Sequence, residues 1–250
     1  MLALACAIQL TPLAAPALPT DADVYRRAAA ALLVLAATWL VSRRRAFAAA
    51  LVGWNPVVAV HFAGGGHRDA LMMALVAAAL ALGDRGSVRR AGVAWALAVL
   101  VKWVPVLLLP LRGLEARARG RHVDHLGFAV TVLIALGVST VLWPWHWLHA
   151  YTSLFHEATR PNSYALPARL GLPTWVFLAA YAAAYVALLA GAARGTARLG
   201  LALGLLLLCL PSLLVWYVLW PLVASAYDRD RAATLLSLAL CAYLLPQTLT

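Results

Sequence analysis

Three ionisable side chains follow a run of glycines near the first third of the chain. Residues 64–66 are all glycine, and His67, Arg68 and Asp69 come directly after them. Glycine lets the backbone or a ligand approach closely, so this turn could hold a reacting group. Asp69 could accept a proton, while His67 or Arg68 could hold an anion. The alternative is a tight turn in which Asp69 caps the helix that begins at Ala70.

A single lysine is the second candidate. Lys102 lies within the apolar run 91–111 and is the only lysine of the chain. A cation inside a membrane segment costs about 3 kcal/mol or more, so such a residue usually has a function. Lys102 could neutralise a lipid phosphate or pair with a carboxylate. Alternatively, its side chain extends to the headgroups beside Trp103, which suits an interface position.

A stripe of polar residues is the third candidate. His146, His149, Ser153, His156 and Arg160 recur three or four positions apart, which places them on one face of a helix. We expect an amphipathic helix on the outer surface of a membrane, with this stripe facing either a polar substrate or solvent. The histidines lack the spacing of a known metal motif, so the sequence predicts no metal site.

Two further segments contain groups that could contact a substrate. Asp21 and Asp23 form a D-x-D pair near the start of the chain. Residues 211–221 are aromatic and lie between two prolines, and Tyr217 is the candidate contact within them. This segment could form a wall that stacks on a sugar or contacts a prenyl chain. Aromatic residues at a bilayer interface would produce the same composition.

The elements that position these residues follow from composition. The chain has 250 residues, of which 64% are hydrophobic and 12% charged. Soluble domains have about 45–50% apolar and about 25% charged residues. With a mean hydropathy of +0.85, soluble enzymes, disordered chains and secreted disulfide scaffolds are excluded. The sequence predicts one all-α transmembrane domain over 1–250, with about 8–10 membrane segments that include short broken or re-entrant helices.

The positive charge of the chain belongs to the ends of these segments. The formal net charge is +11, and the arginines cluster at the ends of long uncharged runs. That placement is typical of loops that flank membrane spans and argues against nucleic acid as a partner. Cys6, Cys209 and Cys241 all lie inside apolar runs, so neither a disulfide nor a zinc site is predicted.

Two apolar runs are broken by proline. Pro105 and Pro110 interrupt 91–111, and Pro211 interrupts 199–227. If both runs enter and return on the same side, 14 arginines lie on one side and five on the other. Single crossings would leave no such bias, so the positive-inside rule favours two re-entrant hairpins. The outer face then carries three segments, 20–27, 64–69 and the long loop 144–173.

Four segments in order carry a resemblance to a known family. They are NPVVAVHFAGGGHRDALMMAL (55–75), LAVLVKWVPVLLLPL (97–111), PNSY (161–164) and SLLVWYVLWPL (212–222). Together they resemble the bacterial polyprenol-phosphate-mannose-dependent mannosyltransferases of the GT-C membrane superfamily. The resemblance extends from about residue 20 to 245, with Arg68 where the family often has Asn.

The resemblance implies an activity and a location. It implies inverting transfer of mannose from a polyprenyl-phosphate donor to a hydroxyl of a glycolipid or polysaccharide acceptor. The protein would be a multi-pass enzyme of the bacterial plasma membrane, embedded in the lipid bilayer and without a cofactor.

The resemblance also implies roles for the candidate residues. A carboxylate would remove the hydroxyl proton, with Asp69 as the first choice, Asp21 or Asp23 as the second, and His67 beside them. The groups that would hold phosphate or substrate are Arg68, Lys102, Arg160, His146, His149, His156 and Tyr217.

One departure from the family gives rise to alternatives. The family carries an acidic residue, usually taken as the general base, in a first outer loop that precedes the segment matching Asn55. Only 54 residues precede Asn55 here, so we expect the N-terminal part of the family's catalytic domain to be missing or supplied by a partner subunit. The chain alone would then be a poor enzyme. The alternatives are a transporter or lipid-binding membrane protein, because broken helices with buried charge also mark transporters, and a non-catalytic partner subunit.

Overall fold

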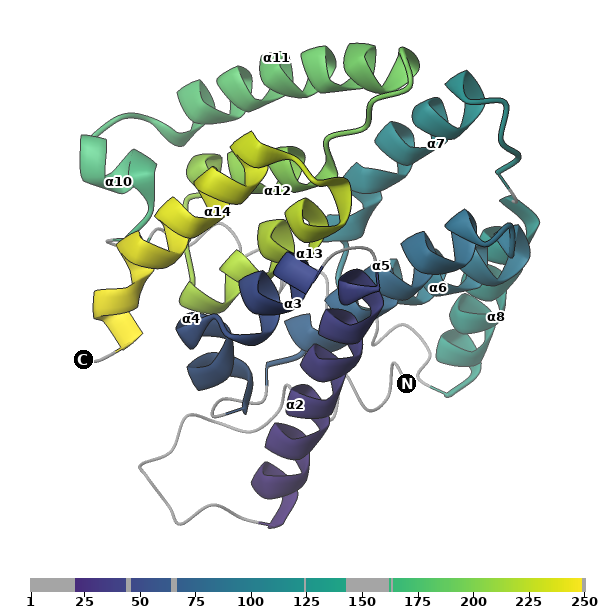
Figure 1. Cartoon of the computed structure of the whole chain (residues 1–250), viewed down its shortest axis with the longest axis horizontal. Coiled ribbons are helices and arrows are strands. Elements are labelled where there is room, and N and C mark those ends of the chain that lie inside the picture. Colours follow the sequence, from purple (N-terminus) through teal and green to yellow (C-terminus); the bar gives the residue numbers. More distant parts are fainter. Residues whose placement is uncertain are drawn as a thin grey trace.

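The computed structural model describes residues 21–43, 46–63, 67–123, 125–142, 162 and 164–248. Within these ranges all regular elements are helices, and none is a strand. Figure 1 shows them packed around one another. The α-helices are α2 (Asp21–Ser42), α3 (Ala46–Gly53), α4 (Pro56–Val58), α5 (Asp69–Asp84), α6 (Val88–Val101), α7 (Leu108–Ala118), α8 (His125–Leu142), α10 (Leu166–Leu170), α11 (Thr174–Ala193), α12 (Leu199–Cys209), α13 (Leu219–Asp228) and α14 (Arg231–Leu244). The tighter or wider turns are η2 (Ala59–Ala63), η3 (Val104–Leu107), η4 (Val215–Val218) and η5 (Leu245–Thr248).

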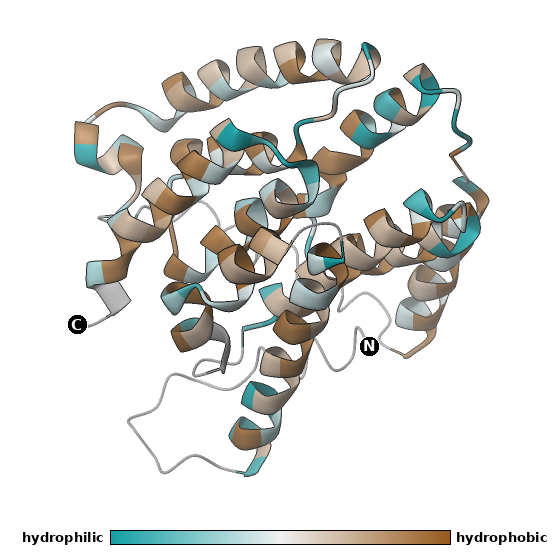
Figure 2. Ribbon diagram, in the orientation of Figure 1, coloured by the Kyte–Doolittle hydropathy of each residue, from teal (hydrophilic) through white to brown (hydrophobic). Residues whose placement is uncertain are grey.

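Three of these helices are long and apolar enough to cross a bilayer. They are α2, α8 and α11, and the shorter helices α12 and α14 are also apolar. Large apolar side chains are exposed on all three long helices, among them Leu32, Leu133 and Val186. Figure 2 shows the same apolar character along α8 and α11. Because lipid is the solvent that tolerates such faces, the predicted all-α membrane fold is confirmed.

The first predicted hairpin is present. Helix α6 ends at Val101, Lys102 is extended with φ −158° and ψ 135°, and η3 and α7 continue the chain. Arg112 in α7 donates a hydrogen bond of 3.0 Å to Asp84, which ends α5 just before α6 begins. The chain therefore returns to the end at which it entered. The helix therefore breaks at Lys102, three residues before Pro105, and not at the proline itself.

The second hairpin follows the same plan. Helix α12 ends at Cys209, and Leu210 is extended because the ring of Pro211 disfavours helical geometry in the residue before it. Asp228, at the end of α13, accepts a hydrogen bond of 3.1 Å from the backbone N–H of Gly200. Eleven residues of α12 span about 16 Å, roughly half of the hydrocarbon thickness. This hairpin also returns to its starting end.

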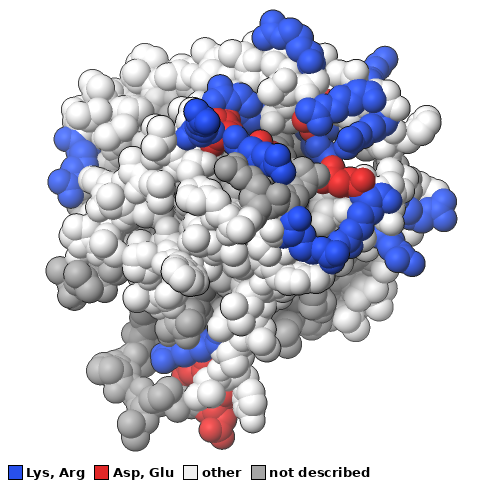
Figure 3. All heavy atoms as spheres, viewed as in Figure 1, with Lys and Arg blue, Asp and Glu red and all other residues white. Residues whose placement is uncertain are grey.

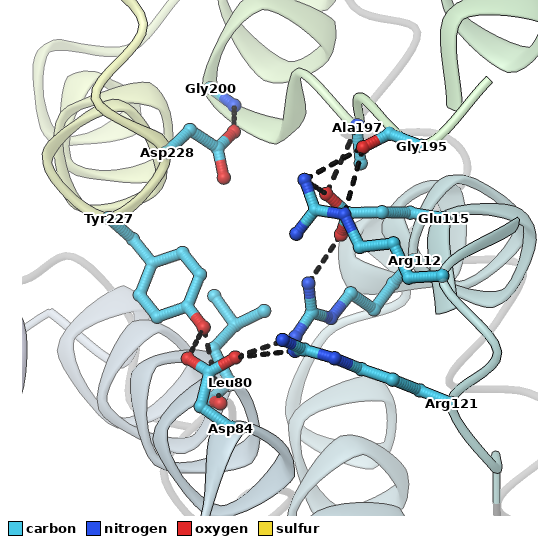
Figure 4. A network of polar contacts seen from close by, with 11 residues as sticks. Leu80, Asp84, Arg112, Glu115, Arg121, Gly195, Ala197, Gly200, Tyr227 and Asp228 are labelled. Atoms are coloured by element: carbon cyan, nitrogen blue, oxygen red, sulfur yellow. Dashed lines mark hydrogen bonds and ion pairs between the residues drawn. The ribbon is translucent and has the colours of Figure 1, made fainter. Parts of the chain in front are cut away.

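A polar network joins the two hairpins at that end. Asp84 accepts hydrogen bonds from Arg112, Arg121 and the hydroxyl of Tyr227. Glu115 is 5% exposed and pairs with Arg112 as well. Figure 4 shows these contacts between α5, α7 and α13, and Figure 3 shows arginines gathered over this part of the surface. The network fixes one end of the molecule as the basic end.

The opposite end lies one helix length away. Helix α5 contains 16 residues, from Asp69 to Asp84, so its two acidic ends are about 22 Å apart. Its side chains Met72, Met73 and Leu80 are fully buried between these ends. Asp69 therefore lies at the end where the hairpins turn, across an apolar core from the basic end.

Candidate functional site

A buried carboxylate is the centre of the site. Asp69 is the first residue of α5 and is 5% exposed. Its Oδ1 accepts a bond of 2.9 Å from Nζ of Lys102 and one of 2.6 Å from Nε1 of Trp220. These residues come from α5, from the break between α6 and η3, and from α13. The turns of both hairpins therefore meet at the start of α5.

Two aromatic rings complete the surroundings of the lysine. The Lys102 ammonium lies 4.4 Å from the ring centroid of Tyr217 and 4.6 Å from that of Trp220. The two rings stack on each other at 4.3 Å, because residues three apart in η4 and α13 share a face. Aromatic faces carry partial negative charge, so they attract a cation. Asp69, Tyr217 and Trp220 together form what we call the Lys102 cage.

A second aromatic group lies beside the cage. The ring of His67 stacks on Trp216 with centroids 3.9 Å apart and planes 14° apart. His61, in the π-helical turn η2, lies 6.3 Å from His67 and 6.2 Å from Trp216. Burial lowers the pKa of His67, which lies in the connection before α5, although the charge of Asp69 acts in the opposite sense. Burial therefore favours the neutral imidazole.

Two asparagines fix the backbone around these rings. Asn162 pairs with the segment 211–213, which leads into η4. Asn55 accepts bonds of 3.0 and 3.4 Å from Val57 and Val58 and so caps α4, which leads into η2. Its amide also donates to Sγ of Cys241 at 3.3 Å. Both turns that carry the aromatic groups are therefore held by side-chain amides.

The structure brings four predicted residues to one place. Lys102 contacts both Asp69 and Tyr217, and His67 stacks on the residue next to Tyr217. The capping interpretation of Asp69 is wrong, because Arg68 is the capping residue of α5 and its side chain makes no cap bond. Of the three interpretations of Lys102, the structure shows a pair with a carboxylate, with 27% of the side chain exposed.

The other predicted residues lie elsewhere or outside the described ranges. Asp21 and Asp23 are in the first turn of α2, where Asp21 is exposed and Asp23 pairs with Arg26 on its own helix. Arg68 directly precedes α5. The polar stripe His146, His149, His156 and Arg160 falls outside the residues that the structure describes.

Three functional candidates were not singled out from the sequence. They are Trp220, Trp216 and His61. The composition of 211–221 indicates the aromatic segment and Tyr217 within it, but spacing alone does not tell which ring faces a charge. Trp220 is 1% exposed, and a buried indole N–H needs an acceptor. The signal that could have identified Trp220 is the carboxylate of Asp69, which is an acceptor in an otherwise apolar chain. Among the described residues, no three His, Cys, Asp or Glu side chains gather as a metal site would require.

One comparison with known proteins gives a match, and it covers part of the chain. The model of the family described as "Alpha-(1->6)-mannopyranosyltransferase, N-terminal domain" matches residues 24–119. No curated protein and no solved structure matches the chain. The matched region includes Asp69 and Lys102, whereas Tyr217 and Trp220 lie beyond it. This match supports a relation to mannosyltransferases, an enzyme class that uses a sugar donor and an acceptor, and it supports a glycosyltransferase activity for the chain.

Proposed function

We propose that the chain is a membrane glycosyltransferase that moves mannose from a polyprenyl-phosphate donor to a hydroxyl of a glycolipid or polysaccharide acceptor. The observation that carries this proposal is the Lys102 cage. It places the only lysine of the chain beside a carboxylate at 2.9 Å and next to stacked aromatic rings. The family match over 24–119 adds mannose as the sugar.

The reaction needs three kinds of group, and the site offers each. The acceptor oxygen attacks the anomeric carbon while the bond from that carbon to the phosphate oxygen breaks. The bonding electrons leave on the polyprenyl phosphate, where the Lys102 ammonium stabilises the negative charge. The hydroxyl proton passes to a carboxylate, and Asp69 is the carboxylate at this site. The half-buried rings of Trp216 and Tyr217 offer faces for the sugar.

The site belongs on the outer face of the membrane. Asp69 lies about 22 Å from Asp84 along α5, and Asp84 belongs to the arginine-rich network. Cytoplasmic loops are enriched in arginine and lysine. The cage at the opposite end of α5 would therefore take its donor from the outer leaflet.

A transfer assay tests this function. Membranes that contain the chain are given radiolabelled mannosyl polyprenyl phosphate and a glycolipid acceptor, and label in the acceptor is counted. Lys102→Met removes the cation and should reduce transfer by about 10²–10³-fold. Arg117→Met is the matched control, since it removes an exposed cation of α7 at the basic end.

Two results would contradict the proposal. One is undiminished transfer by the well-folded Lys102→Met variant. The other is donor lipid that crosses the bilayer without sugar transfer, which would favour the transporter alternative.

A further inference from the structure

The Lys102 ammonium already has an anionic partner. Asp69 lies 2.9 Å from Nζ, and the rings of Tyr217 and Trp220 lie on other sides of the same group. An arriving phosphate therefore competes with Asp69 for this cation. The Lys102 side chain is 27% exposed, so it is not sealed off from an arriving phosphate.

Asp69 is held by more than the lysine. Oδ1 also accepts a bond of 2.6 Å from the Trp220 indole. A buried carboxylate that loses its only partner is strongly destabilised, but Oδ1 keeps a donor when the ammonium moves away. Lys102 itself sits on extended backbone between two helical segments, and its four-carbon stem with three donors can turn toward a new acceptor.

We propose that Lys102 exchanges Asp69 for the phosphate of the lipid donor, and that this exchange releases Asp69 to act on the acceptor hydroxyl. The ion pair is a latch that keeps the base neutralised until the donor is bound. Trp220 is the positioning residue that holds Asp69 through the exchange. This inference rests on the proposed function and adds the order of events at its site.

The latch gives Asp69→Asn two opposite effects. Without the competing charge, Lys102 is available to phosphate, so donor binding becomes tighter while transfer is lost with the base. If Asp69 only positioned Lys102, the same change would weaken donor binding. Trp220→Phe should have the opposite effect on binding under the latch. It should weaken donor binding, because the departure of Lys102 then leaves Oδ1 of Asp69 without its second donor.

The single lysine provides a direct readout that does not depend on turnover. Uniform ¹⁵N-lysine labelling of the full chain in detergent gives one side-chain signal, that of Lys102. A C15 isoprenyl phosphate and inorganic phosphate are titrated separately, which distinguishes recognition of the lipid from recognition of phosphate alone. For the isoprenyl phosphate we expect a saturable shift with a Kd about tenfold lower in Asp69→Asn than in the wild type, a difference of about one decade in affinity. Asp230→Asn, which removes a carboxylate at the basic end and keeps a capping side chain, should leave the Kd unchanged.

Each outcome decides one question. An unchanged or higher Kd in Asp69→Asn overturns the latch and leaves the proposed function standing. A lower or unchanged Kd in Trp220→Phe overturns the positioning role of Trp220, and this test holds even if Asp69→Asn fails to fold. Absence of any Lys102 shift with either phosphate in a wild-type chain that also transfers no mannose overturns the proposed function itself.

Discussion

The side-chain amide of Asn162 pairs with both backbone groups of Leu213. Its Nδ2 donates to the carbonyl of Leu213 at 2.9 Å, and its Oδ1 accepts from the N–H of Leu213 at 3.1 Å. The backbone N–H of Asn162 also donates to the carbonyl of Pro211 at 3.1 Å. The predicted outer loop 144–173 is thereby attached, at Asn162, to the turn of the second hairpin, three residues before Trp216.

Loss of the Asn162 amide should loosen that turn. Asn162→Ala removes both bonds to Leu213, so the backbone amides of residues 212–218 should exchange with solvent faster. Hydrogen–deuterium exchange of peptides from this region measures the effect. Ser212→Ala, which removes only a contact of 3.3 Å with Asn162, is the matched control. Equal exchange in the Asn162 variant and the wild type would show that Asn162 does not hold the turn.

Removal of the Trp220 N–H should weaken both folding and transfer. Trp220→Phe keeps an aromatic ring near Lys102 but removes the bond of 2.6 Å to Asp69. Hydrogen bonds to charged groups contribute about 1.5–3 kcal/mol, so the free energy of unfolding should fall by about that amount. Unfolding in mixed micelles measures it. Trp175→Phe on the exposed face of α11 should change neither stability nor transfer, and an equal loss in both variants would contradict a role for the N–H.

Because α12 and α13 approach closely at Gly200, any larger residue at this position should destabilise the fold. A Cβ atom at Gly200 would lie 2.6 Å from the backbone nitrogen of Ser225. Overpacking of this kind costs about 1–3 kcal/mol, so Gly200→Ala should lower the thermal unfolding midpoint. Gly113→Ala in α7 meets nothing within 4 Å and should raise stability by about 0.5–1 kcal/mol. Similar midpoints for the two variants would contradict the close packing of the second hairpin.

The Arg198–Asp230 pair should stabilise the basic end only above acidic pH. Burial alone would raise the pKa of Asp230, but hydrogen bonds from Arg198 and from the first backbone N–H groups of α14 lower it below its ordinary value of 3.8. A carboxyl with a lowered folded-state pKa contributes stability above its unfolded pKa, and this contribution is lost as pH falls through the folded one.

The stability difference between the wild type and Asp230→Asn should therefore be present at neutral pH and shrink below about pH 4. Thermal unfolding at a series of pH values measures it. A difference that grows toward acid would show that the pKa of Asp230 is raised and not lowered.

The first hairpin should present both of its ends to the same side of the membrane. Single cysteines at Ser87, before α6, and at Ala118, the last residue of α7, are introduced after Cys6, Cys209 and Cys241 are changed to serine. Both should react with an impermeant thiol reagent from one side, and a cysteine at Ala22 in the first turn of α2 should react from the other. Labelling of Ser87 and Ala118 variants from opposite sides would contradict the re-entrant path.

The sequence predicted the hairpins because their signals are local. Pro211 ends α12 through its effect on the preceding residue, and arginines mark the ends of both hairpins whatever the details of packing. The contact between Asp69 and Lys102 is one of three alternatives that the sequence leaves open, since a lone lysine in an apolar run does not show where its partner lies. Trp220 was missed for a related reason, because its bond to Asp69 joins residues 151 positions apart and leaves no pattern in the spacing.

That separation also means that the partners of Asp69 are synthesised at different times. Asp69 and Lys102 emerge from the ribosome within 33 positions of each other, whereas Trp220 follows when most of the chain has been synthesised. Because chains fold from the N-terminus during synthesis, the early intermediate holds an ion pair in the bilayer without its aromatic cover. Ribosomes that stall before η4 would release products with charges exposed to lipid, which are poor substrates for stable insertion. The ion pair therefore gains its aromatic cover only when the segment that contains Trp220 has been synthesised.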